Sequence, residues 1–482
     1  MNYSLASLEI AVVCIGLGVL LVDLWAPELR RVLGYVAATA LGFVLLFSFS
    51  SLAAPDVGLT AFNGLFVQDA FALFFKRLFL VAAILVLILA VEFSDRIPSA
   101  IAEYYALILF ALAGMMFAAS ANDLSLLFVA VELITVTFYV LVSFQRNRLA
   151  SLEAGVKYLI LGALSSAFLV FGIALVSGTS GTMNFQELAA ASPTLAGNRL
   201  FLVGLLLVLA GLGFKIAVFP VQLWAPDVYQ GAPTPTTAFL AIGSKAAGFA
   251  LLLRLLFAAV PAVTMQGARV WMVLAAVTIL YGNLCAIPQR NVKRLLGYSS
   301  IAHAGYLLIG VAVLSAAGQV ALLFHLGGYL FTVLAAFTVI AIVLRHTETE
   351  DVDGLAGLSQ RSPFLAAALT LALASLAGVP PLVGFFGKFL LLKAAVEQGA
   401  ADPAYYGLVG VALVGVVISL YYYFSIVRGI YWSRPSEALK PLSLSQPIRC
   451  VLWACLAGML VLGLFPDVLL NGLVPVVAVF KP

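Results

Sequence analysis

Charged residues inside apolar runs of membrane-spanning length are the feature that most limits how this chain can fold. Glu132, Lys215, Lys245 and Lys388 each lie within such a run. A charged side chain near the centre of a bilayer costs roughly 2.5 to 3.5 kcal/mol, so four of them cost on the order of 10 kcal/mol unless they are paired or hydrated. Residues kept at that cost point to movement of ions or protons.

The composition is typical of a polytopic membrane protein. Of the 482 residues, 64% are hydrophobic and 10% are charged, whereas about a quarter of the residues in a soluble domain carry charge. No polar stretch is long enough to form a soluble domain, so we expect one integral membrane domain over residues 1–482. The net charge of +4 needs no nucleic acid, because basic loop residues can set membrane orientation instead. The four cysteines form no CxxC pair or Cys/His cluster, so no metal or iron–sulfur site is expected.

A window of about 20 residues predicts an all-α fold with about fourteen membrane-spanning helices. The twelfth span is too long for one straight helix and has Pro380 and Pro381 in its middle, which predicts a broken helix. The predicted spans are 5–25, 32–53, 66–92, 101–120, 124–144, 154–177, 199–222, 235–258, 269–287, 296–316, 317–345, 362–396, 404–432 and 448–471.

The basic residues predict how the chain is oriented. Lys and Arg in short loops mark the cytoplasmic side, and here they concentrate in the odd-numbered connections, so we expect both termini to face away from the cytoplasm. Lys76 and Arg77, inside the third span, do not fit this pattern. We expect them either to snorkel or to pack against another subunit. The residues in odd-numbered connections are Arg30, Arg31, Arg96, Arg146, Arg148, Arg290, Lys293, Arg294, Arg345, Arg361, Arg428, Arg434, Lys440 and Arg449.

A weak internal repeat relates the two halves of the chain. Pro220 interrupts the seventh span five residues after Lys215, and Pro380 interrupts the twelfth span eight residues before Lys388. Interrupted helices at corresponding positions mark the sites of transporters. We expect spans four to eight and nine to thirteen to form two five-helix repeats of inverted topology. The predicted division is 1–97 for the first three helices, 98–260 and 261–435 for the repeats, and 436–482 for the last helix.

The four central charges each have a structural and a functional interpretation. Glu132 is either a protonated carboxyl bonded to a neighbouring helix or the counter-ion of a lysine. Lys215 and Lys388 either snorkel or transfer protons beside a helix break, whose free carbonyls can solvate an ammonium. Lys245 stands near the centre of its span, where snorkelling hardly reaches either surface. Desolvation lowers the pKa of an ammonium and a nearby carboxylate raises it, so a moving carboxylate can load or unload a lysine.

Lys157, His303 and His325 are weaker candidates for a relay. Lys157 lies three or four residues inside its span on the basic side, where snorkelling and function are equally compatible with the sequence. The histidines are either satisfied core residues or proton carriers, since an ordinary histidine pKa is about 6.5. The chain has no GxGxxG after a strand, Walker loop, HExxH or nucleophile elbow, so it is not expected to oxidise NADH or hydrolyse ATP alone.

Two long motifs carry a family resemblance over essentially the whole chain. The runs FKIAVFPVQLWAPDVYQGAPTPTTAFL at 214–240 and KRLLGYSSIAHAGY at 293–306 closely resemble the antiporter-like subunits of proton-pumping NADH:quinone oxidoreductase, respiratory complex I. The superfamily also contains subunits of sodium/proton antiporters and membrane-bound hydrogenases. The N-type branch is favoured by Lys388, where the M type typically has a glutamate, and by the chain's ending without the lateral helix of the L type. The run PPLVGFFGKF at 380–389 looks N-type, although D-type antiporter subunits read similarly.

The resemblance implies a proton-translocating subunit whose driving reaction lies in other subunits. Glu132 and Lys215 would form the input pair, Lys245 the central relay and Lys388 the proton-exchanging residue of the second half-channel, with the two histidines nearby. Quinone reduction elsewhere in the complex would change the separation of Glu132 and Lys215.

The same resemblance implies the partners and the location. Flavin, iron–sulfur clusters and quinone would belong to partner subunits, with no cofactor in this chain. The partners would be M- and L-type antiporter-like subunits and small K- and J-type subunits, in a bacterial inner membrane with both termini periplasmic. The alternatives are a D-type subunit of a cation/proton antiporter, a hydrogenase subunit, or an assembly scaffold whose charges are relics.

Overall fold

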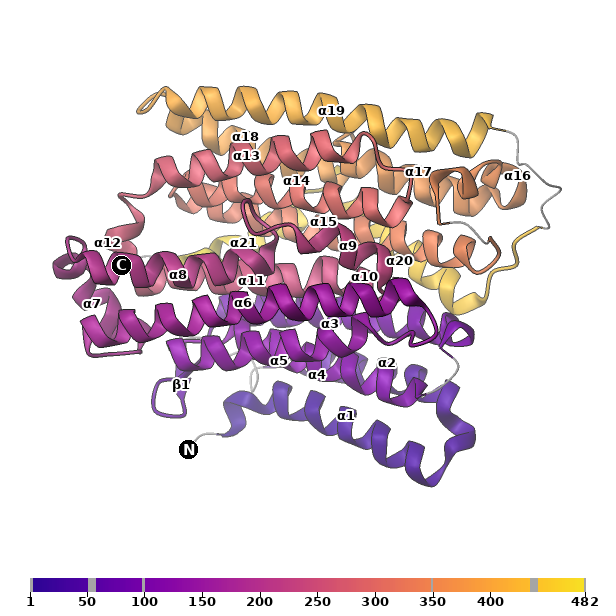
Figure 1. The fold of residues 1–482 in the computed structure, drawn as a ribbon, viewed down its shortest axis with the longest axis horizontal. Helices are drawn as coiled ribbons and strands as arrows, with labels where there is room; N and C mark the ends of the chain where they lie inside the picture. Colours follow the sequence, from indigo (N-terminus) through magenta and orange to yellow (C-terminus); the bar gives the residue numbers. More distant parts are fainter. Residues whose placement is uncertain (1–2, 51–57, 98–99, 348–349, 434–440, 481–482) are drawn as a thin grey trace.

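Long helices running side by side make up almost the whole molecule, as the computed structural model shows (Figure 1). The structure describes residues 3–50, 58–97, 100–347, 350–433 and 441–480. Within these residues, thirteen helices are long and apolar enough to cross a membrane, and the twelfth predicted span is divided into two shorter helices. The predicted all-α membrane fold is therefore confirmed.

The helices that make up the spans are α1 Ser7–Trp25, α2 Arg30–Phe47, α3 Ala70–Glu92, α4 Ile101–Ala119, α5 Leu124–Val142, α6 Leu149–Ser180, α8 Arg199–Ile216, α10 Thr234–Phe239 continued by η4 Leu240–Ser244, α11 Lys245–Leu253 and η5 Arg254–Ala259, then α13 Ala268–Ala286, α14 Val292–Ala312, α15 Ala316–Leu344, α17 Pro363–Ala377, α18 Val383–Gly399, α19 Ala404–Trp432 and α20 Gln446–Leu464. The shorter elements are η1 Tyr3–Ala6, η2 Pro27–Leu29, β1 Leu59–Ala61, β2 Phe66–Gln68, η3 Ser94–Arg96, α7 Phe185–Leu195, α9 Trp224–Gly231, α12 Pro261–Thr264, η6 Val352–Leu355, α16 Leu358–Arg361 and α21 Asp467–Ala478.

The third span begins later than predicted. Residues 66–68 form strand β2, which pairs with β1 in an antiparallel hairpin, and helix α3 starts only at Ala70. The side chain of Asp69 caps this helix by accepting a 2.7 Å hydrogen bond from the main-chain N–H of Ala72. The apolar residues of β2 match a membrane span in composition, so hydropathy alone extended the helix across the cap.

Two other predicted spans were also too long. Helix α2 ends at Phe47, whereas its span was predicted to reach residue 53; residues 51–57 lie outside the described residues. The last predicted span is divided into α20 and α21, because Phe465 precedes Pro466 and adopts a non-helical conformation, as residues before proline commonly do. Two of the basic residues used to predict orientation also lie outside the described residues, namely Arg434 and Lys440.

Both predicted helix breaks are present. Helix α8 ends at Ile216, followed by Ala217 at φ 56°, and the chain resumes as helix α9 after Pro220. Helix α17 ends at Ala377, followed by Gly378 at φ 92°, a left-handed conformation that glycine adopts readily. Pro380 and Pro381 have no N–H to continue a helical ladder, so α18 starts anew at Val383.

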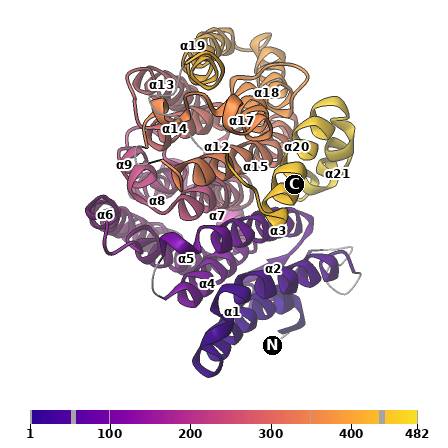
Figure 2. The ribbon, with the colours of Figure 1, turned by 90° about the vertical axis from the view of Figure 1, so that its right-hand side faces the viewer.

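Three helices in the middle of the bundle are almost completely enclosed by protein. In the most apolar window of each, 100% of the residues of Thr234–Ala259, 94% of Val292–Ala312 and 89% of Ala316–Leu344 are buried. Viewed nearly along the helices, α1 and α2 lie at one side of the bundle and α13, α18 and α19 at the other (Figure 2). The enclosed helices carry Lys245 and both candidate histidines, so these side chains have protein around them rather than lipid.

Candidate functional site

The candidate site begins with Glu132 on α5. Its carboxylate is partly buried and accepts a 2.5 Å hydrogen bond from the hydroxyl of Ser166 on α6. Among the described residues, Glu132 makes no ion pair with Lys215. Instead the ammonium of Lys215 donates to the hydroxyl of Thr135, which lies about one helical turn from Glu132 on α5. The two charged groups therefore approach the same segment of α5 without direct contact.

Lys215 is buried in the last turn of α8, directly before the first break. The carbonyl of Phe214 accepts a 2.8 Å hydrogen bond from the indole N–H of Trp224 on α9 and another from the main-chain N–H of Ala217, so this end of the helix does not depend on the lysine. Gly248 of α11 packs against the same turn, and a Cβ there would lie 3.3 Å from Cβ of Lys215 and 2.6 Å from Ile216. Close packing thus brings α8 to within about one helical turn of Lys245.

Lys245 is the first residue of α11, directly after the π-helical segment Leu240–Ser244. Such segments within a helix occur frequently at functional sites. The buried ammonium of Lys245 donates to the main-chain carbonyl of Ser300 on α14 at 2.5 Å and also to its hydroxyl. The same hydroxyl is 3.0 Å from the phenol oxygen of Tyr229 on α9. Lys245 therefore joins the interior of the first repeat to that of the second.

His303 and His325 lie beside each other between Lys245 and Lys388. His303 follows Ser300 by about one turn of α14, and its Nδ1 is 3.2 Å from Nε2 of His325 on α15. Both rings are buried and stack at a centroid separation of 5.4 Å. The other ring nitrogen of His325, Nδ1, has no hydrogen-bond partner among the described residues. A Cβ at Gly387 would lie only 2.5 Å from this nitrogen, so α18 packs directly onto the ring.

Lys388 follows Gly387 and reaches back across the second break. Its ammonium donates to the main-chain carbonyls of Leu376 at 2.7 Å and Ala377 at 3.2 Å, at the end of α17. It also lies 4.9 Å from the ring centroid of Tyr306, a distance at which an ammonium is attracted to an aromatic face. The two lysines at breaks are thus solvated differently, Lys388 by freed carbonyls and Lys215 by a hydroxyl.

Lys157 is not part of this buried row. Its side chain is exposed and forms ion pairs with Glu153 at 2.7 Å and Asp227 at 2.8 Å. Asp227 also pairs with Arg294 of α14. Burial alone would raise the pKa of Asp227, but hydrogen bonds from Lys157 and Arg294 hold it below its ordinary value. The sequence left open whether Lys157 snorkels or takes part in a relay, and this exposed position matches snorkelling.

The structure adds polar residues that sequence reasoning missed. Thr135 and Ser166 contact Lys215 and Glu132, and their only sequence signal is a hydroxyl inside an apolar span. Lys76, for which we expected snorkelling or packing against another subunit, instead forms a 2.6 Å ion pair with Glu9 of α1, and both side chains are fully buried. Arg77 donates to the carbonyl of Ser48 at 2.7 Å. Within the described residues no three His, Cys, Asp or Glu side chains gather as a metal site; that the chain holds no cofactor stays a prediction.

A bundle with two broken helices and a row of buried lysines between them defines an antiporter-type membrane subunit. A family model described as NADH:quinone oxidoreductase/Mrp antiporter, transmembrane, matches residues 121–419, which include all the residues of this row. The chain is 40% identical over 475 residues to NADH-quinone oxidoreductase subunit N of Heliobacterium modesticaldum, covering 97% of each chain. The chain therefore belongs to the subunit N family of NADH-quinone oxidoreductase, and the resemblance inferred from its motifs is confirmed.

Two solved structures share the fold. A chain of respiratory complex I from Thermus thermophilus is 32% identical with a TM-score of 0.78, covering 96% of this chain and 98% of that one. A chain of the Mrp complex from Dietzia sp. has a TM-score of 0.87 at 24% identity, covering 99% of this chain and 97% of that one. The second likeness shows the fold alone.

Proposed function

We propose that this chain is a proton-translocating subunit of a respiratory NADH:quinone oxidoreductase and that redox chemistry in other subunits drives proton transfer along its interior. The observation that carries the proposal is the row of buried or half-buried charged and polar side chains that links the two helix breaks through the enclosed centre of the bundle. In order along the row these are Glu132, Thr135, Lys215, Lys245, Ser300, His303, His325 and Lys388.

Protons pass along such a row by exchange between neighbouring groups. Lys245 and Ser300 are in hydrogen-bond contact, as are the two histidine rings, and a neutral imidazole can accept a proton on one nitrogen while it releases one from the other. The steps from Lys215 to Lys245, from Ser300 to His303 and from His325 to Lys388 have no direct hydrogen bond among the described residues. Bridging water is the ordinary means of joining polar groups at such separations.

The driving event in this proposal acts on Glu132. A carboxylate that approaches a lysine stabilises its ammonium form, and one that moves away favours release of the proton. Glu132 is bonded to Ser166 and lies about one turn from the hydroxyl that accepts from Lys215. A small shift of α5 relative to α8 would therefore change the interaction of this acid with the lysine.

The remaining parts of the proposal concern the complex around the chain. This subunit would carry no redox centre, and flavin, iron–sulfur clusters and quinone would reside in partner subunits. The partners would be M- and L-type antiporter-like subunits and K- and J-type small subunits in a bacterial inner membrane, with both termini on the periplasmic side. The antiporter alternative is less favoured, because the likeness to the Mrp complex lies at 24% identity and the relative at 40% identity is a subunit N.

The proposal is tested with Glu132→Gln and Lys215→Met in the assembled complex in inverted membrane vesicles. NADH-driven acidification should be strongly reduced in both, because each removes one charge of the input segment. Lys157→Met is the matched control, since it removes a lysine of the same repeat that is exposed and outside the row, and it should pump normally. Normal proton-to-electron ratios in both row variants would contradict proton transfer and favour a scaffold. Cation/proton exchange without NADH would favour the antiporter alternative.

A further inference from the structure

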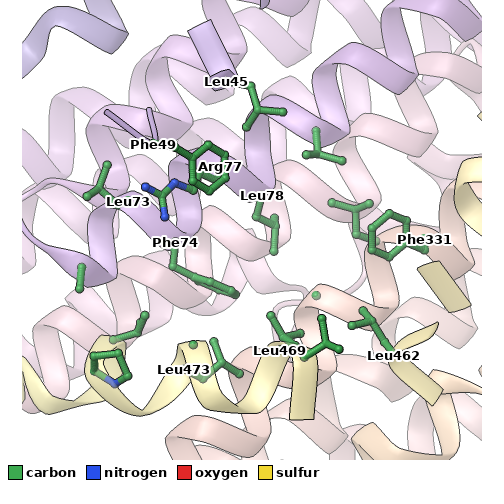
Figure 3. Close-up of a pocket in the computed structure, with 18 residues that line it drawn as sticks. Leu45, Phe49, Leu73, Phe74, Arg77, Leu78, Phe331, Leu462, Leu469 and Leu473 are labelled. Atoms are coloured by element: carbon green, nitrogen blue, oxygen red, sulfur yellow. The ribbon is translucent and has the colours of Figure 1, made fainter. Parts of the chain in front are cut away.

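A largely apolar pocket lies between the helices at the start and the end of the chain. It is formed by α2, α3, α15, α20 and α21 and has a cavity volume of about 610 Å³, within the roughly 300 to 1,000 Å³ typical of small-molecule sites. Figure 3 shows Phe74 and Leu78 of α3 on one wall and Leu469 and Leu473 of α21 on the opposite wall. Its walls are mostly aliphatic or aromatic, so the occupant must itself be largely hydrocarbon.

Among the described residues that line this pocket, Arg77 is the one with a charged side chain. Figure 3 shows its guanidinium at the edge of the pocket beside the ring of Phe49, and the two are 4.0 Å apart from guanidinium carbon to ring centroid. Its Nε and one terminal nitrogen donate to the hydroxyl and the carbonyl of Ser48. In the part of the chain that the structure describes, Arg77 forms no ion pair with a carboxylate.

The guanidinium also lies at the level where a membrane span ends. Ser48, which accepts its hydrogen bonds, is the residue directly after the last residue of α2, and α2 is one of the helices long enough to cross the membrane. Ends of spanning helices lie at the boundary between hydrocarbon and headgroups. The cation therefore lies beside the end of α2, and apolar pocket walls run along α3 on both sides of it.

We propose that this pocket binds one membrane phospholipid with an anionic headgroup, its phosphate on Arg77 and an acyl chain between α3 and α21. The geometry matches this ligand in both parts. An acyl chain fills an apolar slot, and a headgroup phosphate with no cation of its own supplies the counter-ion that Arg77 lacks among the described residues. A guanidinium has five N–H donors in a fork that fits phosphate oxygens, and the bonds to Ser48 use two of its three nitrogens. A quinone would match the slot but would bring no counter-charge.

The lipid is tested on the purified complex in nanodiscs that contain a photoactivatable phosphatidylglycerol, with phosphatidylethanolamine as the zwitterionic probe. Cross-linked peptides mapped by mass spectrometry should come from α3 and α21, and phosphatidylglycerol should exceed phosphatidylethanolamine. Arg77→Gln should lower the phosphatidylglycerol cross-links by about tenfold, the effect of losing one charged hydrogen bond. Arg269→Gln is the charge-matched control at the start of α13 and should change nothing.

A second variant keeps the proposal testable if Arg77→Gln does not assemble. Gly472 lines the pocket, and a Cβ there meets no atom within 4 Å, so Gly472→Leu adds volume without a clash and should lower labelling by both lipids while the enzyme assembles normally. Cross-links at these helices that are equal for the two lipids and unchanged in both variants would overturn the proposal. So would a structure of the assembled complex with a quinone or a side chain of a neighbouring subunit in the pocket.

Discussion

The ammonium of Lys388 donates a 2.7 Å hydrogen bond to the main-chain carbonyl of Leu376 across the break between α17 and α18. The carbonyl of Ala377 accepts a second bond at 3.2 Å. These carbonyls end a helix and have no partner further along it, and unsatisfied carbonyls inside a membrane are costly. The break therefore gives the lysine polar partners, and the lysine stabilises the break. One side chain has a structural task and a proposed functional one.

Replacing Lys388 with methionine should affect both tasks. We expect a loss of stability of about 1–3 kcal/mol, because the carbonyls of Leu376 and Ala377 lose their donor, together with loss of proton pumping. Thermal denaturation of the purified complex and vesicle acidification measure the two effects. Lys388→Arg keeps the charge and the donors and should retain more of the stability. A methionine variant as stable as the wild type would show that the lysine does not hold the break.

The hydroxyl of Thr135 should matter to Lys215. Thr135→Val keeps the shape of the side chain but removes the acceptor of the lysine's hydrogen bond, which costs about 1–3 kcal/mol for a buried donor left unsatisfied. We expect reduced pumping at an unchanged level of assembled complex. Thr137→Val is the control, because Thr137 lies on the same helix and, within the described residues, its hydroxyl donates to the carbonyl of Leu133 and not to a lysine. Equal effects of the two variants would assign the loss to helix packing instead.

The buried pair of Glu9 and Lys76 should be a stabilising contact that depends on both partners. Lys76→Met leaves a carboxylate without its counter-ion at a fully buried site and should destabilise the chain by about 3–5 kcal/mol. The double variant Glu9→Gln with Lys76→Met should recover much of this loss, since no charge is left unpaired. Thermal unfolding of all four forms gives the coupling energy. Additive effects would mean that the ion pair contributes nothing.

Acid should weaken the contact that Glu350 makes with helices α6 and α14. Burial alone would raise the pKa of Glu350, but Lys293 and Arg148 lower it below its ordinary value of 4.5. A carboxylate with a lowered pKa stabilises the fold above that ordinary value, and this contribution is lost as the pH falls through the lowered one. At neutral pH the wild type should be more stable than Glu350→Gln by about 1 kcal/mol in free energy of unfolding. Its melting temperature should be correspondingly higher.

The difference should disappear in acid. Melting curves recorded from neutral pH down to about pH 4 and below check this expectation. Glu397→Gln removes an exposed carboxylate, 3.8 Å from Lys393, and should have little effect at any pH. If the difference in melting temperature between wild type and Glu350→Gln grew as the pH fell, it would contradict this expectation.

Sequence alone could predict which residues are unusual but not which residues they touch. Lys245 and Lys388 were identifiable because a charge in an apolar run is costly, and Pro220 and Pro380 because proline cannot continue a helical ladder. The partner of Lys215 was not identifiable. Glu132 and Thr135 lie about one turn apart on α5, and only the position of α8 relative to that helix decides which of them the ammonium reaches.

Hydropathy likewise could not predict where helices begin and end or which way their side chains point. Two of the three residues of the β-strand at 66–68 are apolar, like most of the helix that follows, so the cap at Asp69 had to be seen in three dimensions. Lys157 reads in the sequence like a residue inside a span, yet its side chain points to the surface and pairs with Asp227, which is 70 positions away. Such long-range pairs depend on how the broken helix folds back.

The most direct test of the central claim is the proton-to-electron ratio of the complex with Lys245→Met, measured in proteoliposomes together with the rate of quinone reduction. Lys245 contacts Ser300 and is the link in the row between the two repeats, so its loss should interrupt transfer from Lys215 to Lys388. The account predicts a clearly lower ratio in a fully assembled complex that still reduces quinone. A wild-type ratio at a wild-type rate would contradict it.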